Sequence, residues 1–205
     1  MIAIIDYNMG NLASVRNALE KIGAASKVVS DPEEVGRFDK MLLPGVGAFG
    51  DAMEHLKQNG MDEAVKAFAK SGKPMLGICL GMQLLFSRSH EFGMHEGLKL
   101  IPGEVVPFDT NLFDKPHKIP HMGWNELFVQ KETPLFAGMP RDFYLYFVHS
   151  FHAVTTDEYA IGRTWYGYEF VSAVQNGNIF GIQPHPEKSH DNGLKILKNF
   201  IDMKV

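Results

Sequence analysis

The sequence has one cysteine, Cys79, in 205 residues. A single thiol cannot form a disulfide within the chain, which excludes the small secreted scaffolds that depend on several disulfides. A lone free thiol suits a reducing compartment, so we expect a cytoplasmic protein. A chain of this length can bury a full hydrophobic core, and it needs neither a disulfide nor a structural metal to fold.

An excess of positive charge and a long hydrophobic run are also missing. Lys and Arg together number 20 and Asp and Glu number 24, so the formal net charge is −4, which disfavours a nucleic-acid partner. No stretch approaches the ~18 uninterrupted apolar residues of a membrane-spanning helix, and the N-terminal segment lacks the basic region of a signal peptide. We therefore expect no membrane partner.

Strand-like and helix-like segments alternate in the first half of the chain. Short apolar runs are typical of buried strands, and we expect such strands at residues 2–6, 25–29, 40–43 and 75–78. Apolar residues at helical spacing predict helices at residues 11–22, 50–58, 62–70 and 81–89. Continuous apolar strands that alternate with helices predict an α/β protein with a parallel sheet covered on both faces.

The second half has a different pattern. Residues 97–128 are rich in Pro, Gly and His and predict short irregular strands, and residues 143–148 predict an aromatic strand. A last helix is expected at residues 193–203. No repeat or linker interrupts the chain, so we predict one domain over residues 1–205.

A hairpin is the clearest local prediction of the second half. Strand-like runs at residues 171–175 and 178–183 flank Asn176-Gly177, a dipeptide typical of a tight hairpin turn. The second half therefore adds an antiparallel extension to the parallel sheet.

Cys79 lies between an apolar strand-like run and a predicted helix, with Gly77 two residues before it and Gly81 two residues after it. This is the spacing of a nucleophile elbow, a strained strand-to-helix turn that leaves no room for side chains beside the nucleophile. A helix N-terminus favours the reactive thiolate, and the backbone N–H of Leu80 would point at a developing oxyanion. A buried structural cysteine is the alternative interpretation.

A cysteine nucleophile needs a base, and His185 is the histidine whose surroundings fit best. His185 and Glu187 are two residues apart in a segment expected to be extended, so their side chains would leave the backbone on the same side. Pro186 between them restricts the backbone. A carboxylate beside an imidazole orients the ring and stabilises its charged form, which indicates a Cys-His-Glu triad. A surface His-Glu pair in a turn is the alternative for this segment alone.

Residues 45–50 match the pattern G-x-G-x-x-G after a predicted strand and before a predicted helix, as in a dinucleotide-binding loop. Three features disfavour that function: the loop follows the third strand, Pro44 precedes it directly, and no acidic residue ends a strand about 20 residues further on. A glycine loop can equally present backbone N–H groups to an oxyanion.

Taken together, residues 77–83 (Gly-Ile-Cys-Leu-Gly-Met-Gln) and His185-Pro186-Glu187 resemble the class I (triad) glutamine amidotransferases. Further segments cover almost the whole chain. They are similar to one branch of that family, glutaminase subunits that supply ammonia to a cyclase in histidine biosynthesis. These segments are 5–12, 43–50, 119–125, 146–151 and 185–189. The resemblance implies a flavodoxin-like three-layer fold, with a mostly parallel central sheet and helices on both faces.

The resemblance also implies a role for each matching residue. Cys79 would attack the side-chain amide of glutamine and form a thioester, His185 would move the proton, and Glu187 would hold His185. The oxyanion hole would use the Leu80 N–H and a backbone N–H of Val46, after a peptide flip, or of Gly47. The residues that would hold the rest of the glutamine molecule are Gly45, Gln83, Ser150 and Phe151. No cofactor and no metal are expected.

Members of this branch pass the ammonia to a (β/α)8-barrel cyclase subunit in a heterodimer. The cyclase makes imidazole glycerol phosphate and aminoimidazole carboxamide ribonucleotide. By the same resemblance, the residues near the cyclase would be Asn8, Met122, Trp124 and Lys188. The alternatives to an interface role are a buried core aromatic for Trp124 and a solvent-exposed surface charge for Lys188.

One position departs from the family pattern. Relatives usually carry an aromatic residue before His-Pro-Glu, whereas this chain has Pro184, which removes a backbone N–H and fixes one φ. Catalysis is still expected because the three triad side chains remain. Two other functions stay open: a glutaminase subunit of a paralogous sugar-amidating system, and a free-standing cysteine amidase on the same fold.

Overall fold

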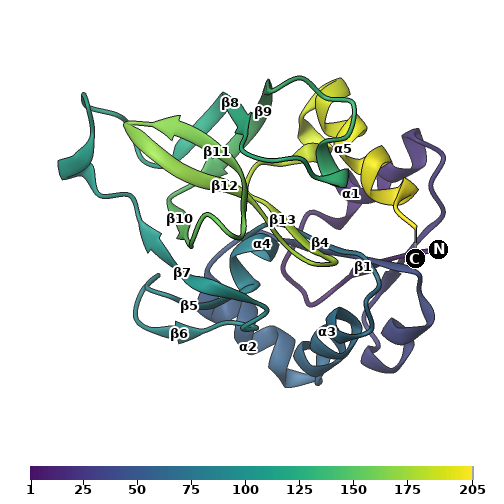
Figure 1. Cartoon of the computed structure of the whole chain (residues 1–205). Coiled ribbons are helices and arrows are strands. Elements are labelled where there is room, and N and C mark those ends of the chain that lie inside the picture. Colours follow the sequence, from purple (N-terminus) through teal and green to yellow (C-terminus); the bar gives the residue numbers. More distant parts are fainter. Residues whose placement is uncertain (205) are drawn as a thin grey trace.

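The computed structural model describes residues 1–204, which contain one sheet flanked by helices (Figure 1). Five neighbouring strands of this sheet run parallel, in the order β2-β1-β3-β4-β13. Their bounds are Ile2–Ile5 for β1, Ser26–Val29 for β2, Lys40–Gly45 for β3, Met75–Cys79 for β4 and Ile179–Ile182 for β13. The four strands predicted in the first half are therefore present.

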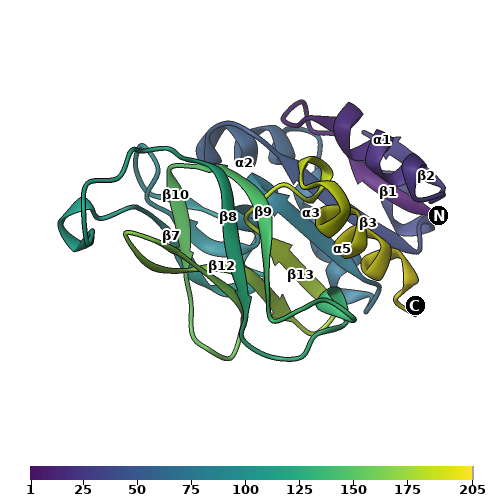
Figure 2. The same ribbon diagram turned by 90° about the horizontal axis from the view of Figure 1, so that it is seen from above.

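Helices cover both faces of the parallel strands, as Figures 1 and 2 show. Each face of the sheet has its own hydrophobic core, and successive residues of β1 point to opposite faces. Ile4 packs with the helices α1 and α5, whereas Ile5 packs with α2 and α3. This division follows from the two-residue repeat of a strand and from the apolar stripe of each helix. The helices are α1 (Leu12–Lys21), α2 (Phe49–Gln58), α3 (Met61–Lys70), α4 (Leu80–Leu84) and α5 (His190–Asp202), with 3-10 turns η1 (Pro32–Arg37), η2 (Thr110–Leu112), η3 (Pro134–Phe136) and η4 (Pro186–Lys188).

The second half extends the sheet with mostly antiparallel strands (Figure 2). β12 joins the extension to the parallel strands because it pairs with β13 across the predicted hairpin. The strands of this part are β5 (Phe86–Ser89), β6 (His95–Glu96), β7 (Ile101–Pro107), β8 (His121–Val129), β9 (Asp142–His149), β10 (Phe151–Val154), β11 (Ala160–Tyr166) and β12 (Tyr168–Asn176). The predicted fold class, a mostly parallel sheet with helices on both faces and an antiparallel extension, is confirmed.

The predicted helix over residues 81–89 is wrong beyond Leu84. Residues Phe86–Ser89 form the strand β5, which pairs in parallel with β7 through Phe86 and Ile101. The local pattern did not show this, because the apolar residues Leu84, Leu85 and Phe86 run without a break from α4 into β5 and fit a helix and a strand equally well.

The boundaries of β3 and α5 also differ from the predictions. β3 continues through Pro44 to Gly45, and it can do so because its pairing with β1 ends at Leu42, so the missing N–H of Pro44 costs no ladder bond there. α5 begins at His190 rather than at Gly193; a Cβ on Gly193 would lie 1.9 Å from Pro186 O, so close packing explains this glycine.

The hairpin turn lies one residue later than predicted, at Gly177 and Asn178, because Asn176 still pairs with Ile179. The Asn178 side chain donates hydrogen bonds to Ala69 O at 3.0 Å and to Lys73 O at 2.7 Å. These long-range hydrogen bonds hold Asn178 in the turn, and a local sequence pattern cannot predict them.

Within residues 1–204, no helix is long and apolar enough to cross a membrane.

Candidate active site

The predicted triad lies at the C-terminal edge of the parallel strands. Cys79 ends β4, Val46 follows β3, and His185 comes three residues after the end of β13. Parallel strands bring these chain positions to the same edge, which is where open α/β sheets place their ligand sites. The edge therefore joins residues that lie about a hundred positions apart in the sequence.

Cys79 has the strained backbone of a nucleophile elbow, with φ +56° and ψ −113°. A β-carbon on Gly77 would lie 2.6 Å from Gly81 O, and one on Gly81 would lie 1.7 Å from Leu43 O. The turn can therefore form only if both positions lack a side chain. A non-glycine residue held at this φ costs free energy, and such strain is concentrated at functional sites.

The helix that follows Cys79 is short. α4 contains only the five residues Leu80–Leu84, so its aligned peptide dipoles are fewer than the sequence pattern predicted. Leu80 is still the first residue of the helix, and the N–H groups of a first turn have no partner within the helix. The Leu80 N–H thus remains a candidate donor to an oxyanion formed near Cys79.

His185 and Glu187 form a buried pair. His185 Nδ1 lies 2.7 Å from Glu187 Oε1, and both side chains are 2% exposed. The extended segment predicted here is wrong: residues Pro186–Lys188 form the 3-10 turn η4, with Pro186 at its start. The close pairing that the prediction needed is nevertheless present, because the turn brings the carboxylate back to the ring.

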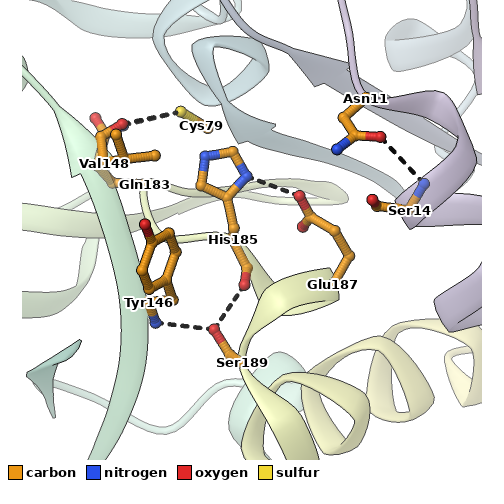
Figure 3. Close-up of polar contacts among 9 residues, drawn as sticks. All are labelled: Asn11, Ser14, Cys79, Tyr146, Val148, Gln183, His185, Glu187 and Ser189. Carbon is orange, nitrogen blue, oxygen red and sulfur yellow. Dashed lines mark hydrogen bonds and ion pairs between the residues drawn. The ribbon is translucent and has the colours of Figure 1, made fainter. Parts of the chain in front are cut away.

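The imidazole of His185 lies between the side chains of Cys79 and Glu187 (Figure 3). Burial opposes a charge on this ring, but the contacts with Cys79 and Glu187 outweigh it and raise the pKa of His185 to about 10. Among the described residues, His185 Nε2 and Glu187 Oε2 have no hydrogen-bond partner. The Cys79 thiol instead donates to Val148 O at a distance of 3.9 Å.

Backbone and side-chain hydrogen bonds hold His185 in place. Its N–H donates to Tyr146 O at 2.9 Å, although the preceding residue is a proline. Ser189, which is 1% exposed, donates to His185 O at 2.6 Å and accepts from the Tyr146 N–H at 2.9 Å (Figure 3). Pro184 therefore leaves the contacts of His185 with β9 intact.

Tyr7 supports the segment predicted to line the oxyanion hole. Its hydroxyl donates to Pro44 O at 2.8 Å, and a Cβ on Gly45 would lie 2.3 Å from the Tyr7 hydroxyl oxygen. Burial, followed by the nearby Cys79, raises the pKa of Tyr7 far above its ordinary value, so the hydroxyl stays a donor. Val46 and Gly47 follow as exposed residues, and Gly47 has φ +102°.

The predicted glutamine-binding residues lie beside the elbow. Gln83 is 5% exposed, and its Nε2 donates to Phe151 O at 3.1 Å. Ser150 joins β9 to β10 and Phe151 begins β10, and both residues are half-buried. The structure thus brings together the elbow, Gln83 and this strand connection.

The residues predicted to face a partner are all partly or fully exposed. Met122 is 62% and Trp124 47% exposed, and Asn8 and Lys188 are exposed as well. The core-aromatic alternative for Trp124 is therefore wrong. Its ring stacks on His190 with centroids 5.1 Å apart, which places Trp124 next to the segment that carries the triad histidine.

Sequence reasoning missed several residues of the site. Tyr7 and Ser189 lie inside the segments that carry the family resemblance, but nothing in the pattern showed their hydrogen bonds. The pattern also gave no sign of the contacts of Gln183, whose Nε2 lies 3.7 Å from Cys79 Sγ, or of His149, whose Nδ1 lies 2.8 Å from Phe151 O. Within the described part of the chain, no three His, Cys, Asp or Glu side chains are grouped to hold a metal ion.

Comparison with known proteins agrees with this geometry. The family model described as glutamine amidotransferase class-I matches residues 3–203. The solved structure of PurLQS from Thermotoga maritima superposes with a TM-score of 0.76 over 98% of this chain and 97% of that chain. At 22% sequence identity this likeness shows the fold alone. The chain belongs to the class I glutamine amidotransferases.

Relatives of higher sequence identity show to which branch of this class the chain belongs. The imidazole glycerol phosphate synthase subunit HisH of Sulfurimonas denitrificans is 66% identical over 201 residues, which are 98% of this chain and 97% of that protein. The protein of the same name from Wolinella succinogenes is 58% identical over 99% of this chain and 100% of its own length. Within its class, the chain is a member of the HisH family.

Proposed function

We propose that this protein is the glutaminase subunit of an imidazole glycerol phosphate synthase. It hydrolyses glutamine to glutamate and ammonia in histidine biosynthesis, as one domain in the cytoplasm. The observation that carries this proposal is a strained cysteine at a strand end, Cys79, beside a buried His185–Glu187 pair. Membership of the HisH family over nearly the full chain supports the choice of pathway.

The first half of the reaction releases ammonia. The Cys79 thiolate attacks the side-chain carbonyl carbon of glutamine, and the electron pair of the C=O bond moves to the oxygen. The tetrahedral intermediate then collapses, the C–N bond breaks, and the leaving nitrogen takes the proton from the His185 imidazolium. The raised pKa of His185 means that this proton is already on the ring at neutral pH.

The second half regenerates the enzyme. His185, now neutral, takes a proton from water as the water oxygen attacks the glutamyl thioester. The intermediate expels the sulfur as thiolate, and glutamate leaves. Glu187 stabilises the charged ring in both halves and, through Nδ1, fixes which nitrogen faces the substrate.

Backbone groups would stabilise the oxyanion and hold the substrate. The Leu80 N–H is one donor, and a second comes from Val46, after a peptide flip, or from Gly47. Gln83 uses its Nε2 within the protein, so its Oε1 is the atom free to accept from the glutamine ammonium. Gly45 and the backbone of Ser150 and Phe151 would complete the pocket.

The partner is a (β/α)8-barrel cyclase that forms a heterodimer with this chain and receives the ammonia. The exposed side chains of Asn8, Met122, Trp124 and Lys188 would contact it, which explains apolar exposure next to the catalytic edge. A dry passage between the subunits would keep the ammonia from being protonated in water.

The test uses the complex of this chain with its cyclase and the variant Cys79→Ala. Glutamine-dependent formation of imidazole glycerol phosphate should fall below detection, whereas formation from added ammonium salts should continue at the wild-type rate. Loss of both activities would contradict the proposal, because the cyclase site lies on the other subunit.

A second experiment separates the alternatives. The isolated chain should hydrolyse glutamine slowly and should become faster when the cyclase is added, and Trp124→Ala should weaken complex formation. Full activity without a partner would instead indicate a free-standing amidase. Co-purification with a sugar-amidating synthase and not with the cyclase would indicate the paralogous system.

A further inference from the structure

A buried glutamine that no function yet explains lies directly beside the nucleophile. Gln183 follows β13, is fully buried, and donates its backbone N–H to Ser172 O at 2.8 Å. Its side-chain Nε2 lies 3.7 Å from Cys79 Sγ, within hydrogen-bonding distance for sulfur. A buried carboxamide needs partners for its polar atoms, so the identity of those partners shows what orients it.

The hydrogen bonds around this glutamine fix which end of its amide faces the sulfur. Phe151 O can only accept, so the atom of Gln83 that lies 3.1 Å from it must be Nε2. The same Nε2 lies 3.0 Å from Gln183 Oε1 and donates to it. Once Gln183 Oε1 is an acceptor, the opposite end of the amide, Nε2, points at Cys79. The orientation of the Gln183 amide therefore follows from Phe151 O, because a backbone carbonyl can only accept a hydrogen bond.

The Phe151 carbonyl is itself held from a second side. His149 Nδ1 donates to it at 2.8 Å, so His149 Nε2 must accept the hydrogen bond from His121 Nδ1 at 2.9 Å. His121 Nε2 then accepts from Asn125 Nδ2 at 3.1 Å. In this arrangement His149 and His121 each use one ring nitrogen as a donor and the other as an acceptor, so both imidazoles are neutral. Burial, followed by His121, lowers the pKa of His149 well below its ordinary value, and burial, followed by His117, lowers that of His121 to about 4.

A fixed N–H donor acts differently on the two forms of a thiol. The neutral thiol already donates to Val148 O, and this carbonyl offers nothing to an ionised sulfur. The thiolate can only accept, and Gln183 Nε2 is a donor already aimed at it in a buried site. A hydrogen bond to a charged group is stronger than one between neutral groups, so the donor favours the thiolate.

We propose that Gln183 is a further catalytic residue, which holds and stabilises the Cys79 thiolate by donating a hydrogen bond from Nε2 to the sulfur. Gln83 orients it through its own carboxamide. This inference rests on the thiolate chemistry proposed above, but it concerns the resting protein and does not require turnover.

The experiment measures how fast iodoacetamide alkylates the full chain as a function of pH. Cys79 is the only cysteine, so the rate reports on this thiol alone. Gln183→Met removes the donor at similar size and should shift the midpoint of the pH profile upward by about one unit, which lowers the rate about tenfold below the midpoint. Gln183→Glu, which also adds negative charge, should shift it further.

The matched control is Gln175→Met. Gln175 is also a glutamine of the hairpin and also accepts and donates one hydrogen bond, from Thr133 Oγ1 and to Gly177 O, but neither bond involves the sulfur. Its alkylation profile should match that of the wild type. A wild-type midpoint in a folded Gln183→Met or Gln183→Glu protein would overturn the proposal, as would a rise in the KM for glutamine with an unchanged profile.

A measurement on the wild type keeps the proposal testable if neither variant folds. One Gln183 side-chain amide proton should move to lower field in the NMR spectrum as the thiol ionises, and this change should be absent in Cys79→Ala. No shift through the alkylation midpoint would overturn the proposal. Because the alkylation profile and the NMR shift do not use glutamine hydrolysis, failure here is distinct from failure of the proposed glutaminase activity.

Discussion

His185 Nδ1 and Glu187 Oε1 lie 2.7 Å apart, and this contact is made within a single 3-10 turn. Both side chains are 2% exposed, so the ion pair has little water around it to screen it. Burying such a pair has a desolvation cost, and removing one partner leaves an uncompensated group. The pair is therefore expected to control both the protonation of the base and the stability of this edge of the sheet.

Glu187→Gln should lower kcat for glutamine-dependent synthesis by about 10²-fold or more, because the imidazolium loses its buried counter-charge. The substitution keeps the size of the side chain, so the melting temperature serves as the control for folding. Steady-state kinetics of the complex with glutamine check this, and ammonium-dependent synthesis should be unaffected. An unchanged kcat would show that Glu187 has no part in the reaction.

The pair should also make stability depend on pH on the alkaline side. The pKa of His185 is raised to about 10, above the ~6.5 of an unfolded histidine. The contribution is fully present below about pH 6.5 and is lost as the pH rises toward 10. Urea unfolding of wild type and His185→Gln at pH 6, 8 and 10 should give a stability difference that shrinks with pH. A constant difference would argue against a raised pKa.

Acid should destabilise the protein through the buried imidazoles. The pKa of His121 is lowered to about 4, mainly by burial, so below pH 6.5 the unfolded chain binds a proton that the folded chain does not. Between pH 6.5 and 4 the free energy of unfolding should fall by at most about 3 kcal/mol from this group. His121→Gln should flatten that part of the curve. A variant with the same slope as the wild type would assign the acid sensitivity to other groups.

Gly81→Ala should destabilise the protein by about 3 kcal/mol or more, because the new Cβ would collide with Leu43 O, a backbone atom in the middle of the sheet. Gly36→Ala is the control: a Cβ there meets nothing within 4 Å, and the stability should change by less than about 0.5 kcal/mol. Chemical denaturation of both variants checks this. Equal stabilities would mean that the elbow tolerates a side chain.

Tyr7→Phe should destabilise the protein by about 1–2 kcal/mol, because it removes the buried hydrogen bond to Pro44 O. The same change should lower glutaminase turnover, because the Tyr7–Pro44 hydrogen bond supports the loop before Val46 and Gly47, which is predicted to line the oxyanion hole. Tyr144→Phe is the matched control, since that ring is 53% exposed. Equal unfolding free energies for the two variants would show that the Tyr7 hydroxyl contributes nothing.

Much of the architecture could be predicted from local pattern. Buried strands such as Met75–Cys79 have continuous apolar sequence, and helices such as Met61–Lys70 have a clear apolar stripe. The pattern failed at Phe86–Ser89, where the apolar run Leu84-Leu85-Phe86 continues from α4 into β5 and carries no periodic signal. It also failed at Gly193, where a glycine that looked like a helix boundary instead allows close packing against Pro186 O.

The sequence by itself determined the elbow, because only glycines at positions 77 and 81 leave room for the turn that presents Cys79. It also indicated which histidine and which carboxylate belong with that thiol. Only the tertiary structure decided how they meet: the parallel strands bring their ends together, and η4 rather than an extended segment closes the His185–Glu187 contact. The hydrogen bond from Gln183 to Cys79 joins positions 104 residues apart, so no local pattern could encode it.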